Sequence, residues 1–291
     1  MSETTPDESG HLTFGDDKIW YERFGQGDKE TVCLLNGLAM HTKAWYWFVP
    51  ALTDDYDVVL YDYLGQGQSS CPDRPHFIPD FCRYLTGIID HIEIDKLHVM
   101  GISYGGFVGL DYGRLYQDRL HTLTLSGILL SHERQFEMYQ DLSLRFYRAG
   151  PVAFELYTHY LYEKIFGEAF LRALPPENLE EMRLRFYERY KNRVYSLVRL
   201  TEAQNPFFDG LEERLTEYQA VRTPVLLVAG EQDRVLPLWQ QKKLLDVFPD
   251  IRFELIEDAG HVVYLERKDD FFPLFKAFIK AKSTDFERPR P

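Results

Sequence analysis

Short apolar runs alternate with longer segments of helical period along most of the chain. The clearest runs hold four or five residues each, which is the usual length of a buried strand. They lie at 31–35, 57–61, 97–100, 122–126, 224–228 and 252–256. Helical spacing is found at 42–53, 79–92, 104–117, 237–248 and 268–280. Strands that alternate with helices are joined by crossovers, so this pattern predicts an α/β fold with a largely parallel sheet.

Two weaker strand signals precede these runs, at 12–14 and 19–23. They flank Gly15, Asp16 and Asp17, and turn-forming residues between two short strands predict an antiparallel hairpin. With this hairpin the predicted sheet has eight strands, of which most are parallel.

The two ends of the chain are expected to lie outside the folded core. Residues 1–10 are polar and acidic, and we expect a disordered tail there. A C-terminal tail is expected at 283–291. The strands and helices between these tails predict a core made of residues 11–130 and 222–282.

The segment at 131–221 interrupts the alternation after the sixth predicted strand. It has no convincing strand, but it shows helical periodicity and is dense in aromatic residues. A helical insertion at this point lies over the carboxyl ends of the strands, where α/β sheets bind ligands, so we predict a lid. Its aromatic residues could form the core of the lid itself or line an apolar site beneath it. They include Phe136, Tyr139, Phe146, Tyr147, Phe154, Tyr157, Tyr160, Tyr162, Phe166 and Phe170.

A candidate nucleophile, Ser103, follows a predicted strand and precedes a predicted helix. It lies in Gly101-Ile102-Ser103-Tyr104-Gly105, the pattern of a nucleophile elbow, in which the glycines let a strained turn pass close to its neighbours. The serine hydroxyl then stands at a helix N-terminus, whose dipole favours a developing anion. Because this pattern arises by chance in about one chain in ten of this size, its meaning depends on its partners.

His261 and Asp233 are predicted to be those partners. A serine hydroxyl is a weak nucleophile at neutral pH, so it needs a base to accept its proton and a carboxylate to orient that base. His261 follows the last predicted strand, and Asp233 follows the strand before it. Taken singly, they could be a surface histidine and a turn residue. Their joint placement at one edge of the sheet favours a catalytic triad with Ser103.

The expected reaction also needs N–H groups that stabilise an oxyanion. The backbone N–H groups of Tyr104 and of Leu38, in the loop after the run at 31–35, are the candidates. For that loop, an ordinary strand-to-helix turn is the alternative. Asn36, His41 and Val262 lie beside these loops and are candidates to line the substrate pocket.

Together these segments resemble the α/β-hydrolase superfamily over residues 12–280. The resemblance rests on LLNGLAMHTKAW, YDYLGQGQSS, GISYGG, GEQD and AGH, which occur in that order. It implies a mostly parallel eight-stranded sheet flanked by helices, with a helical lid inserted after strand 6. It also implies a serine enzyme that uses Ser103, Asp233 and His261 without a metal or an organic cofactor. Haloalkane dehalogenases and epoxide hydrolases carry Asp where Ser103 stands, so neither activity is expected.

Asn36 departs from the pattern of the superfamily. Most of its members have histidine before the glycine of the oxyanion loop. Bacterial 3-hydroxyacyl transferases that draw on acyl carrier protein resemble this chain at that point, and also in DVVLYDYLGQGQSS and AGHVVYLERK. This similarity implies acyl carrier protein or coenzyme A as a partner and acyl transfer as an alternative activity.

Composition narrows the classes of partner. The formal net charge of −13 repels phosphate backbones, so nucleic acid is not expected. No apolar run approaches the roughly 20 residues that span a bilayer, and the N-terminal residues lack a signal-peptide pattern. Cys33, Cys71 and Cys82 have neither the spacing of a zinc site nor that of a disulfide framework. We therefore expect no metal and a cytoplasmic location.

A basic stretch at 182–199 stands out in this acidic chain. It contains six Lys or Arg residues and one Glu. Arg185, Arg189 and Arg193 recur every four residues along one edge of the predicted helix. Such a stretch is either a solvated helix face or a dock for an acidic carrier protein or for a phosphate of coenzyme A.

The sequence thus predicts a serine hydrolase that cleaves a carboxylic ester or thioester. The apolar lid favours a substrate with a hydrophobic acyl or aryl arm, because it excludes water from the site. One alternative is an acyltransferase, in which an alcohol or a second thiol resolves the acyl-enzyme. Two others are a hydrolase that cleaves a carbon–carbon bond with the same triad and a non-catalytic receptor that only binds its ligand.

Overall fold

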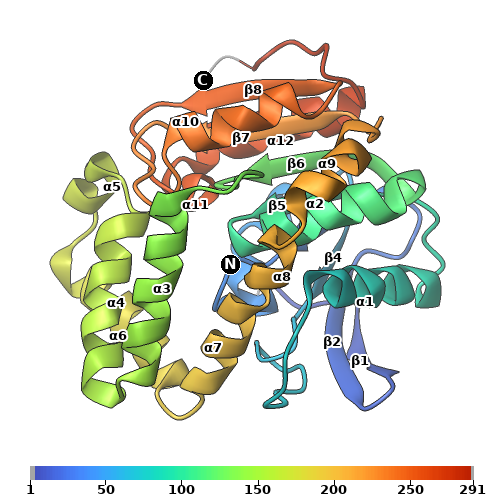
Figure 1. The fold of residues 1–291 in the computed structure, drawn as a ribbon. Coiled ribbons are helices and arrows are strands. Elements are labelled where there is room, and N and C mark those ends of the chain that lie inside the picture. Colours follow the sequence, from blue (N-terminus) through green and yellow to red (C-terminus); the bar gives the residue numbers. More distant parts are fainter. Residues whose placement is uncertain (1–3, 290–291) are drawn as a thin grey trace.

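One eight-stranded sheet forms the centre of the molecule (Figure 1). In the computed structural model, which describes residues 4–289, the strand order is β1-β2-β4-β3-β5-β6-β7-β8. The strands are β1 (Glu8–Phe14), β2 (Asp17–Phe24), β3 (Thr31–Leu35), β4 (Asp57–Tyr61), β5 (Leu97–Ile102), β6 (Leu120–Ser126), β7 (Val225–Gly230) and β8 (Ile251–Ile256). β2 is antiparallel to both of its neighbours, and all other pairs are parallel. The predicted mostly parallel sheet is confirmed.

The burial of the strands follows their positions in the sheet. Every residue of β3, β4, β5 and β7 is buried, because helices cover both faces of a parallel sheet. The edge strand β1 instead alternates between half-buried and exposed residues. Leu35 pairs with Gly101, and Ile102 pairs with Ser126, so β3, β5 and β6 end at the same edge of the sheet. The loops that carry the candidate site leave from this edge.

The predicted tails are shorter than expected. β1 begins at Glu8, which pairs with Arg23, so the prediction of disorder at 1–10 is wrong for the last three of those residues. Residues 1–3 and 290–291 lie outside the described part of the chain. Near the other end, Arg288 Nη1 donates to Glu254 Oε2 of β8 at 3.0 Å, so the segment after residue 282 is attached to the sheet.

Helices cover the two faces of the sheet in separate hydrophobic cores. One face packs against α1 (Ile78–His91), α2 (Tyr104–Tyr116) and α9 (Leu211–Gln219). The other face packs against α11 (Val263–Glu266) and α12 (Lys268–Ala281). The helix predicted at 237–248 begins as α10 (Leu238–Gln241) and continues as the 3₁₀ turn Lys242–Asp246.

The single helix predicted at 42–53 is wrong. The segment forms two 3₁₀ turns, Thr42–Trp45 and Val49–Ala51. Pro50 has no N–H to donate to an α-helical ladder, which interrupts the helix. The apolar spacing was informative nevertheless, since Trp45 and Phe48 are buried in the core beneath α12.

A cap of helices follows β6, as predicted for a lid, and extends from the left to the lower centre of Figure 1. It contains α3 (Arg134–Arg148), α4 (Pro151–Ile165), α5 (Glu168–Ala173), α6 (Pro176–Tyr190), α7 (Val194–Glu202) and α8 (Gln204–Phe208). The predicted boundary at 221 is too late, because α9 packs on α2 of the core. There the Tyr218 hydroxyl donates to Asp111 Oδ1 at 2.7 Å. Periodicity predicts a helix but not the layer in which that helix packs.

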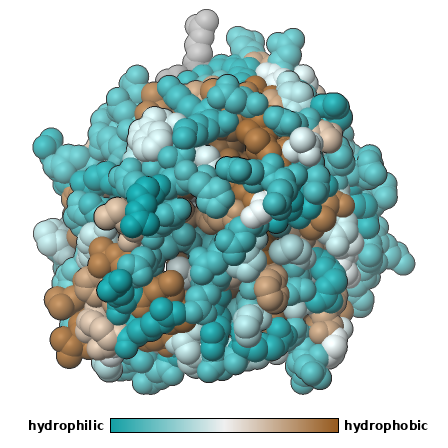
Figure 2. Space-filling model, viewed as in Figure 1, coloured by the Kyte–Doolittle hydropathy of each residue, from teal (hydrophilic) through white to brown (hydrophobic). Residues whose placement is uncertain are grey.

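The cap has a small apolar core of its own. Phe154, Phe186, Tyr190 and Leu197 are among its buried members. Apolar side chains also remain on its outer surface, where Figure 2 shows brown residues at lower left, over the cap helices. The exposed ones are Met138, Leu142, Val152, Leu156 and Leu184. None of the helices within residues 4–289 is long and apolar enough to cross a membrane.

Candidate active site

Ser103 occupies a strained turn between β5 and α2. Its φ and ψ are 49° and −119°, a conformation that side chains rarely adopt. A Cβ on Gly105 would lie 2.6 Å from the Leu35 carbonyl oxygen, and one on Gly101 would lie 2.4 Å from the Gly105 oxygen. The Ser103 N–H donates to the Ser126 carbonyl at 2.8 Å. These close approaches explain why glycine flanks the turn.

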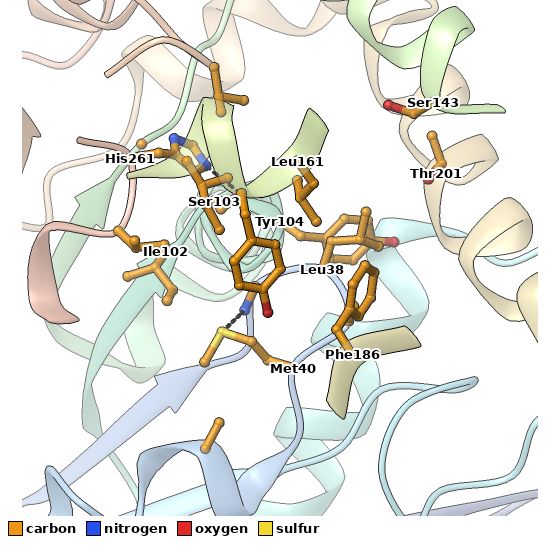
Figure 3. A pocket seen from close by; sticks show the side chains of 18 of the residues that line it. Leu38, Met40, Ile102, Ser103, Tyr104, Ser143, Leu161, Phe186, Thr201 and His261 are labelled. Atoms are coloured by element: carbon orange, nitrogen blue, oxygen red, sulfur yellow. Dashed lines mark hydrogen bonds between the residues drawn. The ribbon is translucent and has the colours of Figure 1, made fainter. Parts of the chain in front are cut away.

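Of the three residues predicted as a triad, His261 lies within hydrogen-bonding reach of both of the others. His261 Nε2 lies 2.8 Å from Ser103 Oγ, and His261 Nδ1 lies 2.9 Å from Asp233 Oδ2 (Figure 3 shows the first pair). The imidazole therefore stands between hydroxyl and carboxylate, as proton transfer from a serine requires. Although 158 positions separate His261 from Ser103 in the chain, the sheet edge brings them together.

Asp233 is fixed by its own loop. Oδ1 accepts hydrogen bonds from the N–H groups of Val235 at 2.9 Å and Leu236 at 2.8 Å. Oδ2 accepts a further bond from Gln241 Nε2 at 3.0 Å, beside the one to His261. The side chain is only 1% exposed, and these bonds satisfy a carboxylate that water does not reach. The carboxylate can thus hold the Nδ1 side of the imidazole in one orientation.

Leu38 and Tyr104, the predicted oxyanion residues, both line the cavity beside Ser103. Tyr104 is the first residue of α2, so its N–H has no partner within the helix. Two hydrogen bonds of Gly37 hold the loop that carries Leu38. The Gly37 N–H donates to Met40 Sδ at 3.2 Å, and the Gly37 carbonyl accepts from Gln66 Nε2 at 3.1 Å. Two backbone segments, the loop that carries Leu38 and the first turn of α2, thus lie next to the serine hydroxyl.

Asn36 is not a pocket residue, contrary to the prediction. It is fully buried beneath the oxyanion loop and does not line the cavity. Its Nδ2 donates to the Tyr61 carbonyl at 2.9 Å, and its Oδ1 accepts from Trp45 Nε1 at 2.8 Å. These bonds hold the end of β3 against β4, so Asn36 supports the loop from below.

A cavity of about 610 Å³ opens above Ser103, between core and cap. His41 and Val262 line it, as predicted. Of the lid aromatics singled out in the sequence, those that line it are Phe136, Tyr139, Tyr147, Tyr157, Tyr162 and Phe166. Tyr147 and Tyr157 also belong to the core of the cap, so both interpretations of the lid aromatics hold in part. Figure 3 shows Leu161 of α4 close to Ser103, with Ser143 and Thr201 at the far side of the cavity.

The basic stretch is not one continuous helix. α6 ends at Tyr190, and the chain turns before α7 begins at Val194, so Arg193 leaves the predicted helix edge. Apolar spacing continued across the break because both helices bury residues in the same cap core. Arg185 and Arg189 line the cavity, whereas Arg193 does not. Arg185 is also paired with Glu181 at 2.5 Å.

His41 faces positive charge across the cavity. Burial, together with the smaller effect of the positive charges of Arg189, Lys43 and Arg193, lowers the pKa of His41 to about 4. The imidazole is therefore neutral at pH 7, and it can serve as a hydrogen-bond donor or acceptor.

The segment between α4 and α5 ties the cap to the catalytic loops. The His261 N–H donates to the Ile165 carbonyl at 2.8 Å, and the Glu168 N–H donates to Gln232 Oε1 at 2.7 Å. A Cβ on Gly260 would lie 2.4 Å from the Gly167 nitrogen, so glycine permits this approach. We refer to residues 165–168 as the strap.

Sequence reasoning did not identify Glu266 as part of this junction. Its Oε2 accepts from the N–H groups of Gly167 at 2.8 Å and Gly260 at 2.9 Å, and its Oε1 accepts from the Val262 N–H at 3.3 Å. Burial raises the pKa of Glu266, and the three N–H groups oppose this rise. One carboxylate thus joins the strap to both sides of His261. No local motif marks it, because its partners are backbone groups.

Among residues 4–289, no group of three or more His, Cys, Asp or Glu side chains could hold a metal ion. Cys33, Cys71 and Cys82 are free cysteines.

A strained serine at the end of a parallel strand, facing a histidine and a carboxylate beneath a helical cap, defines the class of α/β enzymes with a nucleophile elbow. The sequence profile of the family described as alpha/beta hydrolase fold matches residues 30–268. The chain belongs to this α/β-hydrolase family, as its sequence motifs predicted.

Comparisons with known proteins agree with this assignment. The chain is 22% identical over 275 residues to the poly(3-hydroxyalkanoate) depolymerase of Ectopseudomonas oleovorans, covering 92% of this chain and 91% of the relative. It is 23% identical over 262 residues to the 2-hydroxy-6-oxo-2,4-heptadienoate hydrolase of Pseudomonas putida, covering 88% and 91%. A similar solved structure is MGS-M2, an α/β hydrolase from a Medee basin deep-sea metagenome library. It has a TM-score of 0.83 at 21% identity and covers 94% of this chain and 96% of its own. Membership of this family supports hydrolase activity of the general α/β type.

Proposed function

We propose that this protein is a serine hydrolase that cleaves a carboxylic ester or thioester with an apolar arm. The observation that carries the proposal is the contact of 2.8 Å between Ser103 Oγ and His261 Nε2, with Asp233 bonded to the other ring nitrogen. Ser103 Oγ attacks the carbonyl carbon, and His261 Nε2 takes the hydroxyl proton. The N–H groups of Leu38 and Tyr104 stabilise the oxyanion.

The second half of the reaction uses the same groups. His261 gives its proton to the leaving alcohol or thiol, and the acyl group stays on Ser103. A water molecule then attacks the acyl carbonyl carbon while His261 accepts its proton. The bond between Ser103 Oγ and the acyl group breaks, the carboxylic acid leaves, and His261 returns the proton to Ser103. The aromatic lining of the cavity supports an acyl or aryl arm of low polarity, since such surfaces exclude water.

Labelling by a fluorophosphonate probe tests the nucleophile. We expect the wild type and Ser143→Ala to react, and Ser103→Ala to remain unlabelled. Ser143 is a matched control because it lines the same cavity, with its hydroxyl donating to the Tyr139 carbonyl. Ser103→Ala should also lower turnover of nitrophenyl esters by on the order of 10³-fold or more. Unchanged turnover in this variant would contradict the proposal.

The length of the acyl chain tests the apolar arm. In a series of nitrophenyl esters from acetyl to dodecanoyl, kcat/KM should be highest for a medium chain. Each CH₂ that enters the cavity contributes about 0.8 kcal/mol. A preference for acetyl esters would show that the aromatic lining does not receive the acyl group.

Two other reactions can use the same triad. Carbon–carbon bond hydrolysis is favoured by the likeness to the Pseudomonas putida hydrolase, whose named substrate is a hydroxy-oxo-dienoate. Turnover of such a compound, with no turnover of esters, would favour this second candidate.

Acyl transfer, with acyl carrier protein or coenzyme A as the donor, would appear as an ester or thioester product when an alcohol or thiol acceptor is added. A non-catalytic receptor would fail the labelling test.

A further inference from the structure

The residues around the cavity differ in charge from the protein as a whole. The chain has 46 acidic and 33 basic residues, yet no Asp or Glu within residues 4–289 lines the cavity. Three cations do line it: Lys43, Arg185 and Arg189. Among the described residues of this acidic protein, the charged side chains that line the cavity are thus all positive.

These cations lie where the cavity opens. Lys43, Arg185 and Arg189 are exposed to solvent, whereas Phe107, Phe136, Tyr147 and Tyr157 in the same lining are buried. The apolar side chains therefore form the interior and the cations form the rim. We refer to Lys43, Arg185 and Arg189 as the cationic rim.

The rim has members from both halves of the molecule. Lys43 belongs to the 3₁₀ turn after the oxyanion loop, and Arg189 belongs to α6 of the cap. Both act on one group, since each lowers the pKa of His41, which lines the same cavity. Among the described residues, neither has a carboxylate within 4.0 Å, in contrast to Arg185 with Glu181. Within the described part of the chain, the positive charge of Arg185 is therefore neutralised by an ion pair, whereas those of Lys43 and Arg189 are not.

From this geometry we propose that the cationic rim binds an anionic group, a carboxylate or a phosphate, carried by the substrate outside its apolar arm. This inference rests on the proposed function, which places the ester of the substrate at Ser103. Arg189 offers a planar donor fork and Lys43 a point charge, both suited to such oxygens. The anion is either on the far end of the acyl chain or on the leaving group.

Equilibrium binding tests the proposal without turnover. In a Ser103→Ala background, calorimetry would compare two charged ligands with neutral partners. The first pair is the mono-nitrophenyl ester of octanedioic acid and its methyl-capped form. The second pair is octanoyl-coenzyme A and octanoyl-N-acetylcysteamine. We expect the charged member of at least one pair to bind about tenfold more tightly at low salt, and the pair that responds identifies the source of the anion.

Substitutions then assign the effect to the rim. Arg189→Gln and Lys43→Gln should each weaken binding of the charged ligand about fivefold and that of its neutral partner less than twofold. Arg145→Gln removes the same charge from an exposed position of α3 that does not line the cavity, and it should leave the ratio unchanged. The two rim variants lie on different elements, so a local disturbance of one does not decide the result.

Kinetics separate this proposal from the one on which it rests. If the wild type turns over the neutral esters and the charged-to-neutral ratio of binding is close to one in both pairs, the rim proposal is overturned and the hydrolase proposal stands. If no ester is turned over but the ratio still depends on Arg189 and Lys43, the hydrolase proposal fails and the anion site remains. A ratio that Arg145→Gln lowers as much as Arg189→Gln would also overturn the rim proposal.

Discussion

The floor and the roof of the cavity are held in place by different means. The floor carries Ser103, Tyr104 and His261 on loops fixed by glycines and backbone hydrogen bonds. The roof consists of cap helices held by the packing of aromatic side chains such as Tyr157 and Phe186. Backbone geometry demands particular residues at particular positions, whereas many combinations of apolar side chains fill a core. The floor can therefore be recognised from short motifs, and the roof is free to change with the substrate.

The largest effect is expected in the floor, from Asp233→Asn. An amide at this position no longer holds the imidazole as a carboxylate does, so kcat should fall by on the order of 10³-fold or more with little change in KM. Asp258→Asn is a matched control, because it lies three residues before His261 in an exposed loop, at a φ of 56° that Asn tolerates. Equal losses in the two variants would show that the loop, and not the triad, had been disturbed.

An intermediate effect is expected where floor and roof meet, from Glu266→Gln. One amide oxygen cannot replace the carboxylate that joins the strap to the loop of His261, so kcat should fall about tenfold. KM should change less.

The control for this junction is Glu257→Gln, an exposed neighbour of the same loop. A purely structural role for Glu266 predicts a lower melting temperature with an unchanged kcat in the enzyme that remains folded. That outcome would show that the strap only packs against the loop of His261. The floor and the roof would then differ less in how they are held in place.

A smaller effect is expected in the roof, from Leu161→Ala. The substitution enlarges the cavity beside Ser103 without touching the triad. The loss of apolar contact should lower kcat/KM several-fold for the preferred chain and move the preference to longer chains. Exposed Leu156→Ala on the same helix serves as the control. A uniform loss over all chain lengths would mean that Leu161 supports the floor.

The smallest effect is electrostatic and concerns His41, which faces the roof from the floor. Its folded-state pKa of about 4 lies below the ordinary value of 6.5, so the unfolded chain binds a proton that the folded chain does not. Stability from this group is thus fully present above about pH 6.5 and is lost as the pH falls toward 4. In Arg189→Gln, NMR titration should show a higher pKa of His41. An unchanged value would mean that roof and floor are further apart than the structure places them.

The parts of the fold with strong local constraints were predictable from the sequence. The strands β3 and β4 begin and end where their apolar runs do, and Ser103, Asp233 and His261 meet as their loop positions implied. Parallel strands are buried on both faces, so their apolar runs are unbroken. The elbow carries glycines that its geometry requires.

The parts that depend on tertiary packing were not predictable. The break after Tyr190 cannot be recognised in the sequence because α6 and α7 bury residues in the same cap core. No local sequence signal shows that α9 packs on the core through Tyr218. Asn36 and Glu266 act through backbone groups distant in the chain, which leave no pattern in their own neighbourhoods. Periodicity identifies a buried face but not the partner that covers it.

The strap has a consequence for exchanging caps between related enzymes. A graft that replaced the whole insertion between β6 and β7 would remove the Ile165 carbonyl and the Gly167 N–H, and with them two supports of the histidine loop. A chimera that retained residues 165–168 from this chain would change the roof while leaving those supports intact. A cap can thus be exchanged to change the substrate range without loss of catalysis only if the junction of the chimera lies on the cap side of the strap.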